Sequence, residues 1–109
     1  MQPSNKTQAF KASVIQHPPV SLNLEASLEK ACRLAEEAAN RGAQVIVFPE
    51  TWLPGYPIWQ DSSPNAALWD YPPAKALHRL LVENSLSIPG RHLDALLALA
   101  HKTGTYITM

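Results

Sequence analysis

A single carboxylate stands where an apolar segment gives way to an aromatic, proline-rich one. The stretch VIVFPETWLPGYPIW, residues 45–59, ends an apolar run at Pro49 and then presents Glu50. In open α/β sheets, ligands bind beyond the carboxyl ends of the strands, which is where Glu50 is predicted to lie. Partial burial allows a carboxylate to act as a general base near neutral pH. The position therefore favours Glu50 as a catalytic base.

Three aromatic side chains, Trp52, Tyr56 and Trp59, follow Glu50 closely in the chain. We expect them to wall the carboxylate, exclude water from it and offer an apolar surface to a substrate. A structural interpretation stays open, in which Glu50 caps a loop or pairs with an arginine and the aromatic side chains only pack. These tryptophans and Trp69 could also form a subunit interface, where aromatic residues are enriched.

The elements that must position Glu50 follow from the periodicity of apolar residues. Alternation predicts a strand over residues 10–16, and apolar residues recurring every three or four positions predict a helix over 21–42. The continuous apolar run 43–48 predicts a strand buried on both faces, as in a parallel sheet. Strand, helix and strand at this spacing form a βαβ unit. The helix carries no G-x-G-x-x-G at its start, so a dinucleotide site has no support.

The second half of the chain predicts a long loop, two helices and a strand. A loop of this length is unusual unless it is functional. A third strand without a covering helix leaves a sheet face and an edge open, which indicates part of a longer domain. In chain order, we predict a loop over 49–73, a helix over 74–86 with Leu77, Leu80 and Leu81 facing inward, a break over 87–90, a helix over 91–104 and a strand over 105–109.

Composition excludes several classes of protein. The 109 residues carry nine basic and nine acidic side chains, so no surface for nucleic acid or anionic membrane is indicated. No apolar run approaches the roughly 20 residues of a membrane-spanning helix, and the start shows no signal peptide. We expect a globular cytoplasmic protein with a disordered N-terminus, residues 1–9, and one domain portion, residues 10–109.

Other residues with chemical potential have simpler roles. Cys32, the only cysteine, falls beside the apolar stripe of the first helix, which favours packing. The four histidines show no zinc-binding spacing, and no metal site is predicted. Asp61, Asp70 and Glu83 could shape a pocket rim, although ordinary surface acids are favoured. The histidines are His17, His78, His92 and His101.

The segment AANRGAQVIVFPETWLPGYPIW resembles the N-terminal signature of the nitrilases, in the carbon–nitrogen hydrolase superfamily. The resemblance extends through KASVIQ and NLEASLEKACRLAEEAA upstream, and through ALWDYPPAKALHRLLVENSLSIPG to GTYITM downstream. It implies an α/β fold, the α-β-β-α sandwich, of which this chain would be the first part, in β-α-β-loop-α-α-β order. Residues 10–109 would then be the N-terminal part of a hydrolase domain.

The resemblance also implies a mechanism built on a Glu, a Lys and a Cys. Glu50 would be the general base that takes the thiol proton, and Tyr56 would shape the substrate pocket. The thiolate would convert a nitrile, through a thioimidate and an acyl-enzyme, to a carboxylic acid and ammonia. The Lys would stabilise the charged intermediates. No cofactor is implied, the substrate is a small nitrile or amide, and the complete protein is expected to form a homo-oligomer.

This chain departs from the family pattern in one large respect. The family's Lys and Cys lie beyond the third strand, and neither Cys32 nor Lys75 or Lys102 occupies a matching position. The chain by itself is therefore predicted to be inactive. Two alternatives stay open: an amidase of the same superfamily, and a short, non-catalytic product that associates with a full subunit or is a remnant.

Overall fold

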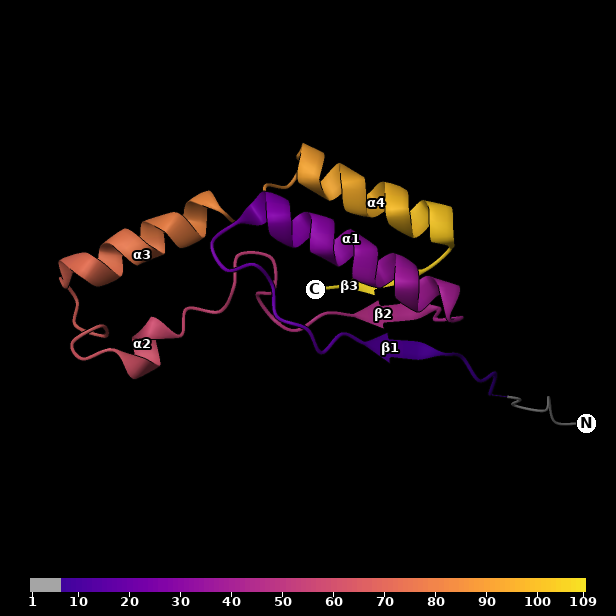
Figure 1. The fold of residues 1–109 in the computed structure, drawn as a ribbon, viewed down its shortest axis with the longest axis horizontal. Coiled ribbons are helices and arrows are strands. Elements are labelled where there is room, and N and C mark those ends of the chain that lie inside the picture. Colours follow the sequence, from indigo (N-terminus) through magenta and orange to yellow (C-terminus); the bar gives the residue numbers. More distant parts are fainter. Residues whose placement is uncertain (1–6) are drawn as a thin grey trace, which may run out of the picture.

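In the computed structural model, which describes residues 7–109, two helices lie on one face of a three-stranded parallel sheet (Figure 1). The predicted β-α-β-loop-α-α-β order is confirmed, apart from a short helix, α2, inside the predicted loop. Most of the predicted disordered segment lies outside the described residues. No described helix is long and apolar enough to cross a membrane. The elements are β1 (Ala12–Val14), α1 (Leu24–Asn40), β2 (Val45–Val47), α2 (Trp59–Ser62), α3 (Pro72–Glu83), α4 (Arg91–Thr103) and β3 (Tyr106–Thr108).

The strands run parallel in the order β1-β2-β3, with β2 in the centre. Ser13 of β1, Ile46 of β2 and Ile107 of β3 share one row of the sheet, and each is the most buried position of its strand. Ile46 is fully buried beneath the helices, which stabilises the fold by about 1.5–3 kcal/mol. Since parallel strands end at the same edge, the segments after β1, β2 and β3 meet there.

Helix α1 covers the sheet as its sequence pattern predicts. Asn23 caps it, because the Asn23 side-chain oxygen accepts a hydrogen bond from the Ala26 N–H at 3.0 Å. The predicted apolar stripe lies in the core, where Leu24, Ala31 and Ala35 are all buried. Small residues in this stripe let the helix lie close to the strands.

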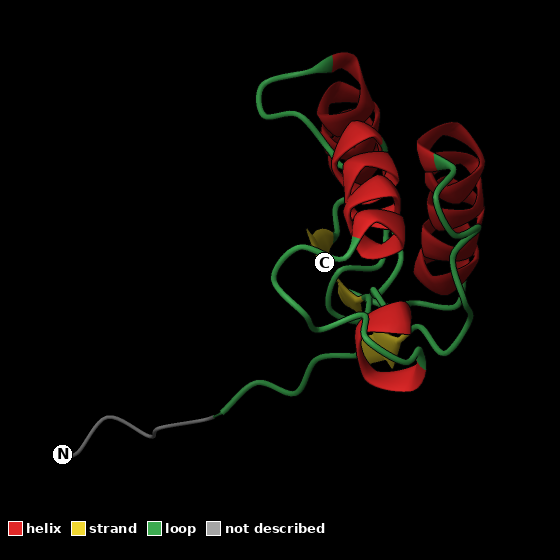
Figure 2. Ribbon diagram, turned by 90° about the vertical axis from the view of Figure 1, so that its left-hand side faces the viewer, coloured by secondary structure: helices red, strands yellow, loops and turns green. Residues whose placement is uncertain are grey.

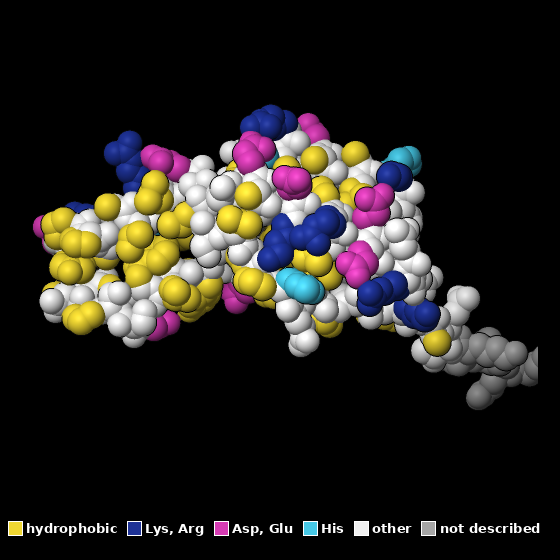
Figure 3. Space-filling view, viewed as in Figure 1, with side chains coloured by type: hydrophobic (Ala, Val, Ile, Leu, Met, Phe, Trp, Pro, Cys, Tyr) yellow, Lys and Arg dark blue, Asp and Glu magenta, His cyan; other side chains and the backbone are white. Residues whose placement is uncertain are grey.

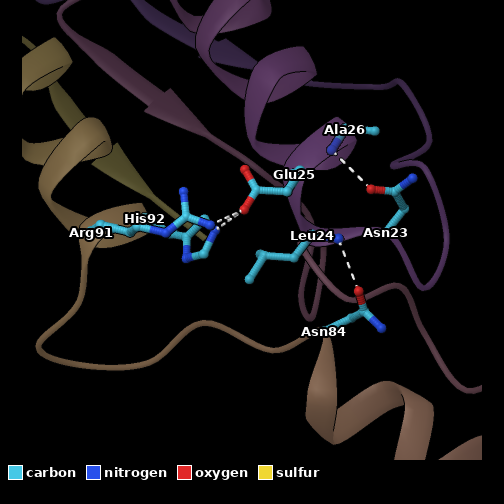
Figure 4. A network of polar contacts seen from close by, with 7 residues as sticks. All are labelled: Asn23, Leu24, Glu25, Ala26, Asn84, Arg91 and His92. Carbon is cyan, nitrogen blue, oxygen red and sulfur yellow. Dashed lines mark hydrogen bonds and ion pairs between the residues drawn. The ribbon is translucent and has the colours of Figure 1, made fainter.

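Helix α4 lies beside α1 and is tied to it by polar contacts (Figure 4). One carboxylate oxygen of Glu25, in the first turn of α1, contacts Arg91 and lies 2.7 Å from Nε2 of His92. Leu96 buries the inner face of α4 in the core. The helix ends at Gly104, whose φ of +65° is the left-handed conformation expected of a glycine C-cap.

The other face of the sheet is open, which corrects the prediction that the second strand is buried on both faces. Val45 and Val47 are only half-buried, because no second layer covers them. Figure 2 shows the strands with no helix on the side away from α1 and α4. The register places six residues on this open face: Ala12, Val14, Val45, Val47, Tyr106 and Thr108.

Helices α2 and α3 form an arm, residues 56–83, that extends away from the sheet (Figures 1 and 3). The prediction that Leu77, Leu80 and Leu81 face a core is wrong, because α3 has no buried residue and Leu80 is 43 % exposed. The radius of gyration of 17.9 Å exceeds the roughly 13 Å of a compact domain of this size, as an unpacked arm requires.

Candidate active site

Glu50 lies at the carboxyl edge of the sheet, as its sequence position predicts. It follows Phe48, whose backbone N–H donates a 2.8 Å hydrogen bond to the carbonyl of Thr108. The ends of β2 and β3 are therefore held side by side where Glu50 leaves the sheet. The carboxylate is exposed to solvent, so the expectation of partial burial is wrong for the chain as described.

Trp52, two residues on, has the opposite environment. Its ring is 3 % exposed and meets Phe48 edge-on, with the ring centroids 5.0 Å apart. Its indole N–H donates a 2.7 Å hydrogen bond to the carbonyl of His17, in the segment that follows β1. Trp52 thus belongs to the core and joins the segments that leave β1 and β2.

A shallow hollow of about 170 Å³ lies along the turn that begins after Glu50. It has the size of a small substrate group and opens at the carboxyl ends of β2 and β3. Parallel strands place ligand sites at this edge. Its lining residues are Thr51, Trp52, Leu53, Pro54, Leu86 and Met109.

Tyr56 and Trp59 line a different hollow, of about 380 Å³, between the start of the arm and the segment before α1. Its walls are largely apolar and include Pro54 and Leu77. Glu50 lines neither this hollow nor the one along the turn. The predicted aromatic wall around Glu50 is therefore not formed: Trp52 packs inward, and Tyr56 and Trp59 lie on the arm.

The remaining candidates are engaged elsewhere. Burial, and to a lesser degree the negative charge of Glu36, raise the pKa of the Cys32 thiol, which disfavours the nucleophilic thiolate. Lys75 pairs with Asp70 on the exposed arm, and Lys102 pairs with Glu36 at 3.0 Å. None of these residues occupies the carboxyl edge of the sheet beside Glu50.

No group of three or more histidine, cysteine, aspartate or glutamate side chains among the described residues could hold a metal ion. The histidines have separate environments: the carbonyl of His17 accepts from Trp52, and the ring of His92 contacts Glu25. Asp70 and Glu83 form exposed ion pairs on the arm, as expected of surface acids.

Sequence reasoning missed the backbone that shapes this site. Thr51 has a φ of +55°, and a threonine gives no signal for such a conformation. The role of the His17 carbonyl was equally hidden, because the contact joins residues 35 positions apart in the chain. The Pro54-Gly55 pair is a partial signal, because this dipeptide is typical of a type II turn, in which the glycine has a positive φ. Gly55 has a φ of +93°.

Several known proteins are similar to this chain in sequence. The carbon-nitrogen hydrolase family profile matches residues 11–109. An arylacetonitrilase of Aspergillus niger is 45 % identical over 83 residues, which are 76 % of this chain and 22 % of that protein. An arylacetonitrilase of Hypocrea virens is 36 % identical over 102 residues, covering 94 % of this chain and 29 % of that protein. A nitrilase of Pseudomonas syringae is 37 % identical over 102 residues, covering 86 % and 29 %.

The match covers almost all of this chain but a limited part of each relative. The chain spans about a quarter of the length of the curated relatives it matches. The matched residues include both the sheet and the turn after Glu50. With the family profile running from β1 to the end of β3, this chain belongs to the carbon-nitrogen hydrolase family.

Proposed function

We propose that this chain is the N-terminal segment of a nitrilase-type hydrolase and that Glu50 is its general base. The observation that carries the proposal is the placement of Glu50 at the carboxyl edge of a parallel sheet, within a segment that matches the nitrilases. Residues 10–109 would form the first part of the hydrolase domain. Its uncovered sheet face would pack against a second sheet.

In the proposed reaction, Glu50 accepts the proton of a cysteine thiol and the thiolate sulfur attacks the nitrile carbon. The nitrile nitrogen then takes up that proton, which gives the thioimidate. Water adds to the thioimidate, ammonia leaves and an acyl-enzyme forms. A second water hydrolyses the acyl-enzyme and releases the carboxylic acid and the thiol. A lysine ammonium stabilises the charged intermediates. A second layer over Glu50 would supply the burial that the described chain does not.

For the substrate we propose an arylacetonitrile. Several relatives carry the name arylacetonitrilase, and the described chain offers an apolar hollow lined by Tyr56 and Trp59. An aromatic ring is flat and apolar, which suits a hollow of this composition. Trp52 would support the site from the core side, where it is already fixed by its hydrogen bond to His17.

We propose that the 109-residue chain does not hydrolyse nitriles by itself. Its one cysteine, Cys32, lies on α1 against the core with a raised thiol pKa. Both lysines considered for the charge-stabilising role are held in ion pairs. The complete hydrolase would supply the nucleophile and the lysine. A homo-oligomeric state and a cytoplasmic location stay predictions from the resemblance and the composition.

The test is a chimera in which residues 11–109 replace the matching segment of the Aspergillus niger arylacetonitrilase. We expect ammonia release from phenylacetonitrile, and we expect Glu50→Gln to lower kcat by about 10²–10⁴-fold, the usual contribution of a general base. Glu83→Gln is the matched control, because Glu83 is an exposed carboxylate of the arm and should leave kcat unchanged.

The alternative within the family is an amidase, which would share Glu50 and differ in its pocket. Giving the chimera and the complete natural protein both phenylacetonitrile and phenylacetamide separates the two. Ammonia from the amide alone would favour the amidase. A folded chimera that keeps its activity after Glu50→Gln would contradict the role proposed for this residue.

A further inference from the structure

The residue after Glu50 holds a backbone conformation that its side chain disfavours. Thr51 has a φ of +55°, in the left-handed region, although a side chain branched at Cβ rarely adopts it. Leu22, in the segment before α1, also has a φ of +55°. Such conformations persist only where the surrounding structure enforces them, and they cluster at functional sites.

The turn itself supplies part of the enforcement. The Gly55 N–H donates to the carbonyl of Thr51 at 3.1 Å, and the Leu22 N–H donates to the carbonyl of Pro54 at 3.1 Å. A Cβ at Gly55 would lie 3.3 Å from Oγ of Ser21, so the two segments approach closely because this residue is a glycine. The turn and the segment before α1 therefore hold each other.

Trp52 also restrains the backbone next to Thr51. Its buried ring packs on Phe48, and its indole N–H reaches the carbonyl of His17 at 2.7 Å. This anchor fixes the chain on the far side of Thr51, while β2 fixes it on the near side. The backbone of Thr51, held between β2 and the buried Trp52, therefore sets the direction in which Glu50 leaves the sheet.

We propose that Thr51 is a positioning residue: its enforced left-handed backbone holds Glu50 at the open edge of the sheet while it turns Trp52 into the core. This inference rests on the proposed function, since it takes Glu50 as the base. A glycine at position 51 would relieve the strain but would let the segment sample other conformations. A strained turn that presents a reacting side chain at a strand end is a known catalytic device, as in the α/β-hydrolases.

The first test is the kinetics of Thr51→Gly in the chimera. We expect kcat to fall on the order of 10²-fold, the effect of a misplacement of about 1 Å, with little change in KM. The thermal midpoint should stay the same or rise, because strain is removed. Asn65→Gly is the matched control: Asn65 also has a positive φ, of +63°, but lies on the arm. It should leave kcat unchanged.

The outcomes distinguish this inference from the proposed function. Loss of activity in Glu50→Gln together with full kcat in Thr51→Gly would overturn the positioning role alone. Activity that survives Glu50→Gln would overturn the proposed function. A Thr51→Gly variant that loses both kcat and thermal stability would also contradict the inference, because that result indicates a structural role.

The second test needs no activity and uses the 109-residue chain. Hydrogen exchange of single amides, measured by NMR, reports whether the turn is held as described. Trp52→Phe keeps an aromatic ring but removes the donor to His17, so the Gly55 amide should exchange faster than in the unmodified chain. Trp69→Phe is the control, because the ring of Trp69 is 98 % exposed. An unchanged exchange rate of the Gly55 amide in Trp52→Phe would contradict the inference that Trp52 restrains this turn.

Discussion

At the scale of single residues, neighbours in the chain have opposite environments. Glu50 is exposed and Trp52 is buried, and the left-handed Thr51 lies between them. A strand that continued straight would place positions 50 and 52 on the same face. The turn therefore separates an exposed carboxylate from a buried ring that packs in the core.

The environment of Cys32 lowers the reactivity of its thiol. Burial raises the pKa of its thiol, so the thiolate fraction at neutral pH is lower than that of an unperturbed cysteine. We predict that iodoacetamide alkylates Cys32 more slowly in the folded chain than in the chain unfolded in urea, as followed by mass spectrometry at pH 7.5. Alkylation of the folded chain at the faster, unfolded rate would contradict this environment.

At the scale of elements, α1 organises the molecule. Its apolar stripe covers the sheet, and its first turn contacts α4 and the residue that follows α3 (Figure 4). Glu25 holds the start of α4, and the Leu24 N–H donates to the Asn84 side chain at the end of α3 at 3.2 Å. The two later helices differ because α4 buries Leu96 whereas α3 has no buried residue.

The contact between α1 and α4 should depend on pH in a defined direction. The hydrogen bond from His92, followed by the hydrogen bond and charge of Arg91, lowers the pKa of Glu25. A carboxyl group with a lowered folded-state pKa stabilises the fold above its unfolded-state pKa, and this contribution disappears as the pH falls through the folded-state value. The contact of ionised Glu25 with His92 and Arg91 therefore stabilises the fold at neutral pH, and this stabilisation disappears in acid.

We predict that Glu25→Gln lowers the free energy of unfolding at pH 7 and that its difference from the unmodified chain shrinks below about pH 4. Urea unfolding across this pH range measures the effect. Glu29→Gln, one turn further along α1 at an exposed position, is the control and should leave the curve unchanged. A difference that persists undiminished in acid would show that the contact does not depend on the Glu25 charge.

At the scale of the whole molecule, the described residues leave apolar surface uncovered on the open sheet face and on the arm, among other places. The open sheet face includes Val14 at 68 % and Tyr106 at 78 % exposure. The arm exposes Leu68 and Trp69, and hydrophobic side chains gather over it in Figure 3. Uncovered apolar surface and free strand edges drive association between chains.

We predict that the 109-residue chain associates in a concentration-dependent way during size-exclusion chromatography with light scattering. Val14→Lys should shift it toward the monomer, because a charge on the open face opposes sheet-to-sheet contact. Asn40→Lys, at an exposed position of the last turn of α1, adds the same charge away from both apolar surfaces and serves as control. A clean monomer with a cooperative melt would instead support a self-sufficient short protein.

The sequence by itself determined the elements and the position of the candidate base. The apolar pattern predicted α1 and β2, the helix predicted over 91–104 corresponds to α4, and the apolar run before Glu50 predicted the carboxyl edge of the sheet. These features depend on residues close together in the chain, so local pattern suffices to predict them. The segment around Glu50 resembles the carbon-nitrogen hydrolases, and the family match over residues 11–109 confirmed this assignment.

Only the tertiary structure decided what surrounds Glu50. Trp52 and Tyr56 are both large aromatic residues of the same turn region, yet one is buried and the other is 57 % exposed. That difference depends on contacts with distant segments, such as the carbonyl of His17, which no local pattern encodes. The amphipathic sequence of α3 likewise predicts a buried face, but a helix buries its stripe only where another layer is present to receive it.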